Sequence, residues 1–134
     1  MSSHEADLVR TLFARLSARE FDALVGGLAE DVEFDLAYAP EFLPMPTVGR
    51  AAVGELIRTV IGGMFDPFRI EVVTTYEGAE PGLVVAEYRS EGTVKHNGNW
   101  YVNRYVGIFR FVDDELVFWR EYHNPEEATK AMAG

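Results

Sequence analysis

Two closely spaced hairpin signals in the last third of the chain constrain the fold more than any other feature. The runs 83–95, 100–112 and 115–124 are rich in Val, Tyr and Phe, which is typical of strands. Asn97-Gly98 separates the first two runs and predicts a two-residue turn, and Asp113-Asp114 predicts a second turn before the third run. The sequence therefore predicts three consecutive antiparallel strands.

These turns also predict which side chains share a face of the sheet. A two-residue turn at Asn97-Gly98 places Glu91 opposite Arg104, and the turn at Asp113-Asp114 places Glu121 opposite Val106. Because side chains alternate between the two faces along a strand, one face should gather eight residues. They are Arg89, Glu91, Arg104, Val106, Ile108, Trp119, Glu121 and His123. Charged groups set among apolar ones predict a polar spot in an apolar cavity, although a one-residue bulge would move part of this set to the other face.

The opposite face is predicted to carry mainly aromatic side chains. In this register it holds Tyr101, Asn103, Tyr105, Phe109, Phe111, Leu116, Phe118 and Tyr122. An exposed apolar face of this size needs a partner, so the pattern predicts a homodimer. If the register differs by one residue, Asn103 and Tyr105 would line the cavity instead.

The rest of the chain adds helices and two further strands. Leu and Val residues at helical spacing predict helices over 4–18, 20–29 and 50–63. Strands are predicted over 32–38 and 68–77, and Asn124-Pro125 begins a short terminal helix. Helices followed by a meander of strands predict one α+β domain over 1–134, with a curved mixed or antiparallel sheet wrapped around three helices. The proline-rich segment 40–46 carries Phe42, Leu43 and Met45 and is predicted to act as a lid over the cavity.

Composition limits the classes of function. The formal net charge of −10 disfavours nucleic acid and anionic membranes as partners. The chain has no Cys, and its three His residues do not stand at metal-ligand spacing, so we expect neither a metal nor another cofactor. The first five residues lack the basic start and apolar stretch of a secretory signal, and we expect a cytoplasmic location.

The segment Trp100–Pro125 resembles the nuclear transport factor 2-like (NTF2-like) superfamily, and within it the SnoaL-like group. The resemblance is carried by Tyr101-Val102-Asn103-Arg104-Tyr105, by Val106-Gly107-Ile108-Phe109, and by Trp119-Arg120-Glu121-Tyr122-His123-Asn124-Pro125. It implies a cystatin-like barrel with a cone-shaped cavity between a curved sheet and three helices. It also implies a homodimer.

Three groups of this superfamily place a carboxylate near position 121. In phenazine-biosynthesis A/B proteins the catalytic glutamate aligns with Glu121, and in polyketide cyclases of the SnoaL type an aspartate aligns near it. In limonene-type epoxide hydrolases, an Arg-x-Asp pair and a later Asp align with Arg89-x-Glu91 and Glu121. The resemblance therefore implies that Glu121, Glu91 and Arg89 are catalytic. The predicted substrate-binding residues are Tyr38, Arg104, Val106, Ile108, Trp119 and His123.

The favoured function is a cofactor-free enzyme that binds a small apolar, oxygenated metabolite. Glu121 would move a proton during isomerisation, cyclisation or condensation, with Arg89 and Glu91 positioning it. Two alternatives stay open. Glu121 could activate water for epoxide hydrolysis while Glu91 protonates the leaving oxygen, or the cavity could only bind an apolar ligand without catalysis.

Overall fold

The computed structural model describes residues 3–134, so the first two residues of the N-terminal segment lie outside the described residues. The helices are α1 (His4–Ser17), α2 (Phe21–Gly26), α3 (Arg50–Ile57), its π-helical continuation η1 (Arg58–Gly62), and α4 (Pro125–Met132). The strands are β1 (Leu28–Leu36), β2 (Thr47–Val48), β3 (Phe65–Glu77), β4 (Leu83–Val94), β5 (Trp100–Val112) and β6 (Glu115–His123). None of the helices in this part of the chain is long and apolar enough to cross a membrane.

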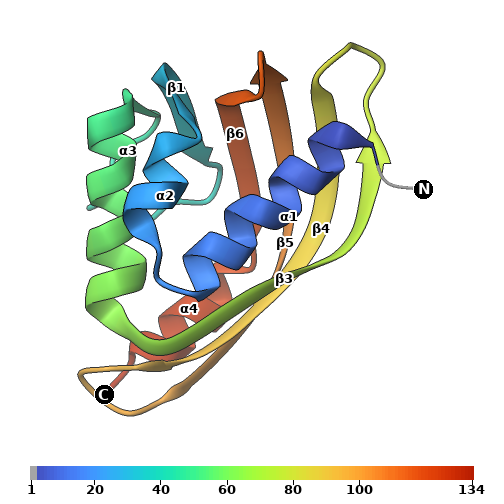
Figure 1. The fold of residues 1–134 in the computed structure, drawn as a ribbon. Coiled ribbons are helices and arrows are strands. Elements are labelled where there is room, and N and C mark those ends of the chain that lie inside the picture. The colour runs from blue at the N-terminus through green and yellow to red at the C-terminus, as the bar shows by residue number, and fades with distance from the viewer. Residues whose placement is uncertain (1–2) are drawn as a thin grey trace.

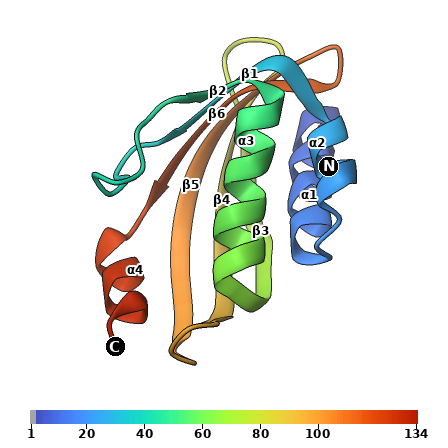
Figure 2. The ribbon, with the colours of Figure 1, turned by 90° about the vertical axis from the view of Figure 1, so that its left-hand side faces the viewer.

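The six strands form one curved, mixed sheet in the order β2-β1-β6-β5-β4-β3. Strand β1 runs parallel to β6, and every other neighbouring pair is antiparallel. The sheet curls around α1, α2 and α3, which lie on the same side of it (Figures 1 and 2). We call the side toward these helices the inner face and the opposite side the outer face. This arrangement confirms the predicted α+β fold with a curved sheet.

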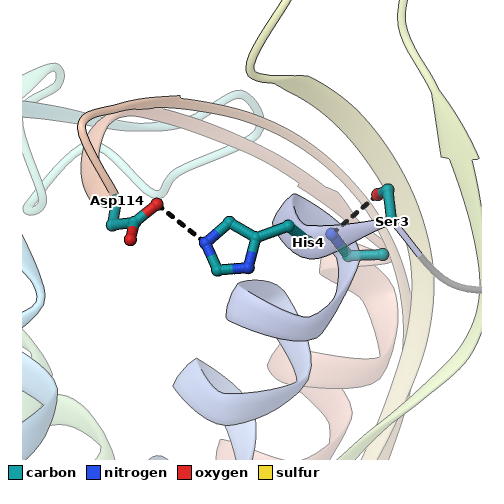
Figure 3. Close-up of polar contacts among 4 residues, drawn as sticks. Ser3, His4 and Asp114 are labelled. Carbon is teal, nitrogen blue, oxygen red and sulfur yellow. Dashed lines mark hydrogen bonds and ion pairs between the residues drawn. The ribbon is translucent and has the colours of Figure 1, made fainter.

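Helix α1 is fixed at its start by a cap and by a contact with the β5–β6 turn. The hydroxyl of Ser3 accepts a hydrogen bond from the backbone N–H of Ala6 at 3.1 Å, as a capping serine does. His4 Nε2 lies 2.8 Å from Asp114 Oδ1 (Figure 3), and this hydrogen bond raises the pKa of His4. The first contact caps the start of α1, and the second ties this end of the helix to the β5–β6 turn.

An aromatic cluster joins α1 to the inner face. Phe13 projects from α1, and its ring centroid lies 4.4 Å from that of Tyr88, 5.8 Å from Trp119 and 5.9 Å from Phe109. All four side chains are almost completely buried. Burial of large aromatic surfaces is the main stabilising contribution in such a core, so α1 is firmly seated against β4, β5 and β6.

The first hairpin has a longer loop than predicted. Its loop spans residues 95–98 rather than Asn97-Gly98 alone, because the backbone N–H of Val94 bonds the carbonyl of Asn99 at 2.9 Å. As a result Arg89, not Glu91, lies opposite Arg104. The register between β4 and β5 differs from the predicted one by two residues. Because side chains alternate with a period of two, Arg89, Glu91 and Arg104 still share one face, as predicted.

The second hairpin contains a bulge that changes the faces. Asp113 and Asp114 form the predicted two-residue turn, both with positive φ (49° and 67°). Beyond it, Phe111 pairs with Leu116 but Arg110 pairs with Phe118, so Val117 is an extra residue in β6. From Phe118 onward the register is therefore shifted by one residue, and the side chains of β6 lie on the face opposite to the predicted one. The prediction that one face carries all eight residues is wrong.

The bulge separates the predicted set into two groups. Arg89, Glu91, Arg104, Val106 and Ile108 lie on the outer face, whereas Trp119, Glu121 and His123 lie on the inner face. The predicted aromatic dimer face is also wrong for five of its members, which belong to the core: Tyr101, Tyr105, Phe109, Phe111 and Leu116. Asn103 and Tyr105 lie on the inner face, as the alternative register anticipated.

Two smaller differences concern element boundaries. Helix α2 ends at Gly26 and β1 begins at Leu28, four residues before the predicted strand. Leu28 and Ala29 are both buried in β1, so the apolar residues that suggested a longer helix belong to the strand. The third predicted helix continues through residues 58–62 with π-helical rather than α-helical hydrogen bonding.

Candidate active site

An apolar cavity of about 100 Å³ lies between the inner face and the helices. Its walls come from α1, α3 with η1, the 37–46 segment and strands β1, β3, β5 and β6. The lining residues are Phe13, Leu16, Phe34, Leu36, Leu43, Leu56, Ile57, Val60, Ile61, Phe68, Ile70, Tyr105, Trp119 and Glu121. Glu121 is the only carboxylate in this lining, so any charge in the cavity is concentrated on one group.

The environment of Glu121 favours the protonated carboxyl. Its side chain projects from β6 on the inner face and is partly buried among apolar groups. Burial raises the pKa of Glu121 from 4.5 to about 7, because desolvation penalises the charged form, and the hydrogen bond from Tyr88 opposes this rise. Near neutral pH both protonation states are therefore populated, which suits a group that accepts and returns a proton.

The side chain of Glu121 makes one hydrogen bond among residues 3–134. Tyr88 Oη, from β4, donates to Glu121 Oε1 at 2.5 Å. The same Oη accepts a hydrogen bond from Trp119 Nε1 at 3.3 Å. Burial raises the pKa of Tyr88 well above its usual value, so Tyr88 is a neutral donor at ordinary pH. The printed bond uses Oε1, and the Glu121 side chain is part of the cavity lining.

A second polar group lies beside the cavity and is fully hydrogen-bonded. Asn103 Nδ2 donates to Tyr101 Oη at 2.8 Å, Tyr101 Oη lies 3.1 Å from Tyr105 Oη, and Tyr105 Oη lies 2.7 Å from Ser90 Oγ. Asn103 also bonds both the backbone N–H and the carbonyl of Asn124, at 3.0 and 2.9 Å. This network anchors the start of α4 to β5.

His123 lies next to this network, because it pairs with Tyr105 across β5 and β6. It lies on the inner face opposite Tyr105 and is partly buried. Its Nδ1 is enclosed and has no hydrogen-bond partner among the described residues. Burial lowers the pKa of His123, so the ring is neutral at pH 7. A neutral imidazole with a free ring nitrogen can donate to or accept from a bound molecule, but His123 is not part of the cavity lining.

Comparison with known proteins identifies the family. The model of the SnoaL-like domain matches residues 9–119 of the chain. The chain belongs to the SnoaL-like domain family. The match includes Tyr88, Trp119 and most of the cavity lining, and ends two residues before Glu121.

Two relatives of this SnoaL-like protein differ in how far they align. Uncharacterized protein YesE of Bacillus subtilis is 29% identical over 110 residues, which cover 78% of this chain and 71% of YesE. An uncharacterized PhzA/B-like protein of Pseudomonas aeruginosa is 27% identical over 66 residues, which cover 49% of this chain and 47% of that protein. The second relative agrees with the resemblance to phenazine-biosynthesis A/B proteins.

Solved structures show the same fold. An NTF2-like protein of unknown function from Burkholderia pseudomallei superimposes with a TM-score of 0.84 at 19% identity, covering 99% of this chain and 100% of that one. An LEH-like epoxide hydrolase from Mycobacterium tuberculosis superimposes with a TM-score of 0.75 at 17% identity, covering 94% of this chain and 86% of that one. At these identities the likeness shows an NTF2-like fold and no more.

Within this SnoaL-like fold, Arg89 and Glu91 lie away from Glu121. Both are exposed on the outer face, where Arg89 Nη2 forms an ion pair with Glu71 Oε1 at 2.6 Å. Arg104 lies beside them, opposite Arg89. An open depression of about 870 Å³ borders these side chains, but its lining alternates between the two faces of β4 and β5, so it is not a single chamber. The structure does not bring the three predicted catalytic residues together.

The predicted substrate-binding residues are also divided. Trp119 forms part of the cavity wall. Val106 and Ile108 point to the outer face with Arg104, and Val106 is 39% exposed. Tyr38 is 58% exposed and packs edge-on against Tyr122, with ring centroids 6.0 Å apart. Of the predicted set, the inner face thus holds only Trp119 and His123 together with Glu121.

Tyr88 is not among the residues predicted from the sequence, although the sequence contains a signal for it. Along β4, apolar or small residues occupy positions 84, 86, 88 and 90, while Glu87, Arg89 and Glu91 occupy the alternate positions. Such alternation is typical of a strand with one face buried, and it places Tyr88 on the inner face and Arg89 on the outer face.

Of the segment 40–46, which was predicted to act as a lid, Leu43 lines the cavity, while its neighbour Phe42 is 82% exposed.

Proposed function

We propose that this SnoaL-like protein is a cofactor-free enzyme in which Glu121 transfers a proton on a small apolar carbonyl compound. The observation that carries the proposal is the single carboxylate, with a pKa near 7, in an otherwise apolar cavity. Active-site carboxylates are tuned in this way when they must both take and give a proton near neutral pH.

The chemistry follows from the position of the Glu121 carboxyl group in the cavity lining. Ionised Glu121 takes a proton from a carbon next to the carbonyl group; the C–H electron pair moves into the C–C bond, and the carbonyl oxygen becomes an enolate oxygen. Where a C=C bond adjoins the reacting carbon, the enolate is a dienolate; protonated Glu121 returns the proton to its far carbon and the C=C bond moves, which gives an isomer. Alternatively, the enolate carbon attacks a second carbonyl carbon within the molecule, and the alkoxide that forms from that carbonyl takes the proton from Glu121, which gives a ring. Both outcomes balance without a cofactor.

The cavity also restricts the substrate. Its walls are aliphatic and aromatic, so they favour apolar surface over charged groups. An anionic substrate would meet the negative charge of Glu121 in surroundings of low polarity, which is unfavourable. A neutral, mainly hydrocarbon ketone or aldehyde fits these walls, and the volume of about 100 Å³ favours a small one.

Epoxide hydrolysis has less support. In that alternative Glu121, Glu91 and Arg89 act on the same epoxide, but Arg89 and Glu91 lie on the outer face and Arg89 pairs with Glu71. The similar epoxide hydrolase from Mycobacterium tuberculosis supports a shared fold. A protein that only binds an apolar ligand needs no carboxylate of raised pKa in its cavity. The noncatalytic alternative therefore does not explain why Glu121 lines the cavity.

Hydrogen exchange at carbon tests the proposal directly. A panel of small cyclic ketones and enones in D₂O is incubated with the wild type, with Glu121→Gln and with Glu91→Gln, and deuterium uptake next to the carbonyl is followed by NMR. We expect Glu121→Gln to lower the rate by about 10² to 10⁴, the usual range for a general acid or base. Glu91→Gln is the matched control and should keep the wild-type rate.

Three results would count against the proposal. Equal exchange by the wild type and Glu121→Gln would mean that Glu121 does not move the proton. Incorporation of ¹⁸O from labelled water into an epoxide substrate, lost in both variants, would favour hydrolysis. Ligands that raise the Tm without exchange or turnover across the panel would favour a binding protein.

A further inference from the structure

Tyr88 and Glu121 come from strands that are not neighbours. Tyr88 lies on β4 and Glu121 on β6, and β5 runs between them. Neighbouring strands are about 4.8 Å apart, so the two backbones are separated by about twice that distance. The hydroxyl of Tyr88 nevertheless reaches Glu121 Oε1 at 2.5 Å, which requires the side chain to cross the inner face of β5.

Gly107 provides the space for this crossing. It lies on β5 directly opposite Glu121, and its inner face has no side chain. A Cβ atom at this position would stand 2.6 Å from Tyr88 Oη and 2.6 Å from Phe109 Cε1, both far inside normal contact distance. The missing side chain at Gly107 therefore leaves the space that the Tyr88 hydroxyl and the edge of the Phe109 ring occupy.

The ring of Tyr88 is held on both sides. Tyr105 stacks on it with centroids 5.0 Å apart and an interplanar angle of 11°, and Phe13 packs against it from α1. Tyr88 is only 1% exposed. Since Trp119 Nε1 donates to Tyr88 Oη, an oxygen lone pair is already occupied and the hydroxyl proton is directed to Glu121. Donation from Trp119 also polarises the hydroxyl and makes it a stronger donor.

We propose that Tyr88 is a positioning residue that fixes the Glu121 carboxyl through Oε1 and so presents Oε2 to the cavity. The inference rests on the proposed role of Glu121 in proton transfer and adds the group that orients it. Tyr88 does not line the cavity and touches no substrate. It acts on the reaction only through Glu121, by stabilising the ionised carboxylate and holding it in one rotamer.

Tyr88→Phe tests the role without a known substrate. The variant keeps the ring and its packing but removes the donor, so the ionised form of Glu121 loses its hydrogen bond. The pKa of Glu121, followed by the ¹³C shift of its carboxyl carbon in labelled protein, should rise from about 7 by about one unit. Tyr105→Phe is the matched control: it removes a buried hydroxyl that bonds Ser90 and Tyr101 but not Glu121, and should leave this pKa unchanged.

Activity provides the second readout once a substrate is known. With a pKa one unit higher, the ionised fraction at pH 7 falls from about half to about one tenth, so Tyr88→Phe should lower kcat about fivefold at pH 7 and recover toward pH 9. KM should change little, because Tyr88 does not contact the substrate. Equal loss of kcat at all pH values would mean that Tyr88 only maintains the structure.

The wild type supplies a test that does not depend on any variant folding. If Tyr88 donates to Glu121, the ¹³C shift of Tyr88 Cζ must titrate with the same midpoint as the Glu121 carboxyl. A Tyr88 signal that ignores the Glu121 titration, or an unchanged Glu121 pKa in Tyr88→Phe, would overturn the proposal. Because both measurements use ligand-free protein, they stand even if the protein proves to have no proton-transfer activity.

Discussion

Glu121 should destabilise the folded protein at alkaline pH, and Glu121→Gln should remove that cost. The pKa of the group is about 7 in the folded protein and 4.5 in its ordinary state. Between these values the folded protein holds a proton that the unfolded chain has released. Stability therefore falls as the pH rises through this window, and it falls no further above it.

The size of the effect follows from the pKa difference. Each pKa unit corresponds to about 1.4 kcal/mol, so the rise from 4.5 to about 7 corresponds to at most about 3 kcal/mol. Glutamine resembles the protonated carboxyl in size and keeps an acceptor for Tyr88. We therefore expect Glu121→Gln to match the wild type near pH 4.5 and to exceed its free energy of unfolding by up to about 3 kcal/mol at pH 8.

Urea denaturation of the two proteins from pH 4.5 to pH 8 measures this difference. Other titrating groups, including His123 with its lowered pKa, affect both proteins alike and cancel. Glu91→Gln, which alters an exposed carboxylate, should show no comparable window. A wild-type-minus-variant difference that stays flat between pH 4.5 and 8, or a variant less stable at pH 8, would refute the view that Glu121 is desolvated in the cavity.

Three further predictions address the rest of the molecule. Asn103→Ala removes buried hydrogen bonds to Tyr101 and to the backbone of Asn124, and should lower the free energy of unfolding by about 2–4 kcal/mol in urea denaturation; a loss below about 0.5 kcal/mol would mean that water replaces them. We expect a homodimer that uses the outer face, where Val106 is exposed; light scattering should give twice the 15.0 kDa chain and Val106→Asp should halve it, whereas a 15.0 kDa wild type would contradict this prediction. Segment 40–46 should gain hydrogen-exchange protection when a tight ligand covers Leu43, and unchanged protection would remove its role as a lid.

The fold was predictable because its signals are local. Apolar spacing predicted α1 and α3, the strand-like runs predicted β4, β5 and β6, and Asp113-Asp114 predicted the turn that the structure contains. The parallel pairing of β1 with β6 joins residues far apart in the sequence and has no such signal. Even so, helices followed by a meander were sufficient to predict an α+β fold with a curved sheet.

The candidate site was predictable only in part. Trp119, Glu121 and His123 were correctly predicted to share a face, because they are spaced two residues apart within one strand, β6. The error lay in joining them to β4 and β5, since the faces of different strands are related only through the register. In the first hairpin a four-residue loop replaced the two-residue turn, and the resulting shift of two residues changed pairs but not faces.

Val117 is therefore the residue on which the site depends. Without this extra residue the second hairpin would keep one register throughout, Glu121 would lie opposite Val106, and its carboxylate would point to the solvent-facing side beside Arg104 and Arg89. With it, Glu121 lies opposite Gly107, where the hydroxyl of Tyr88 can reach it and the cavity surrounds it. A β-bulge next to an active site commonly re-aims a side chain in this way. The extra residue allows Leu116 and Trp119, which are three residues apart, both to be buried on the inner face, whereas in a regular strand they would lie on opposite faces.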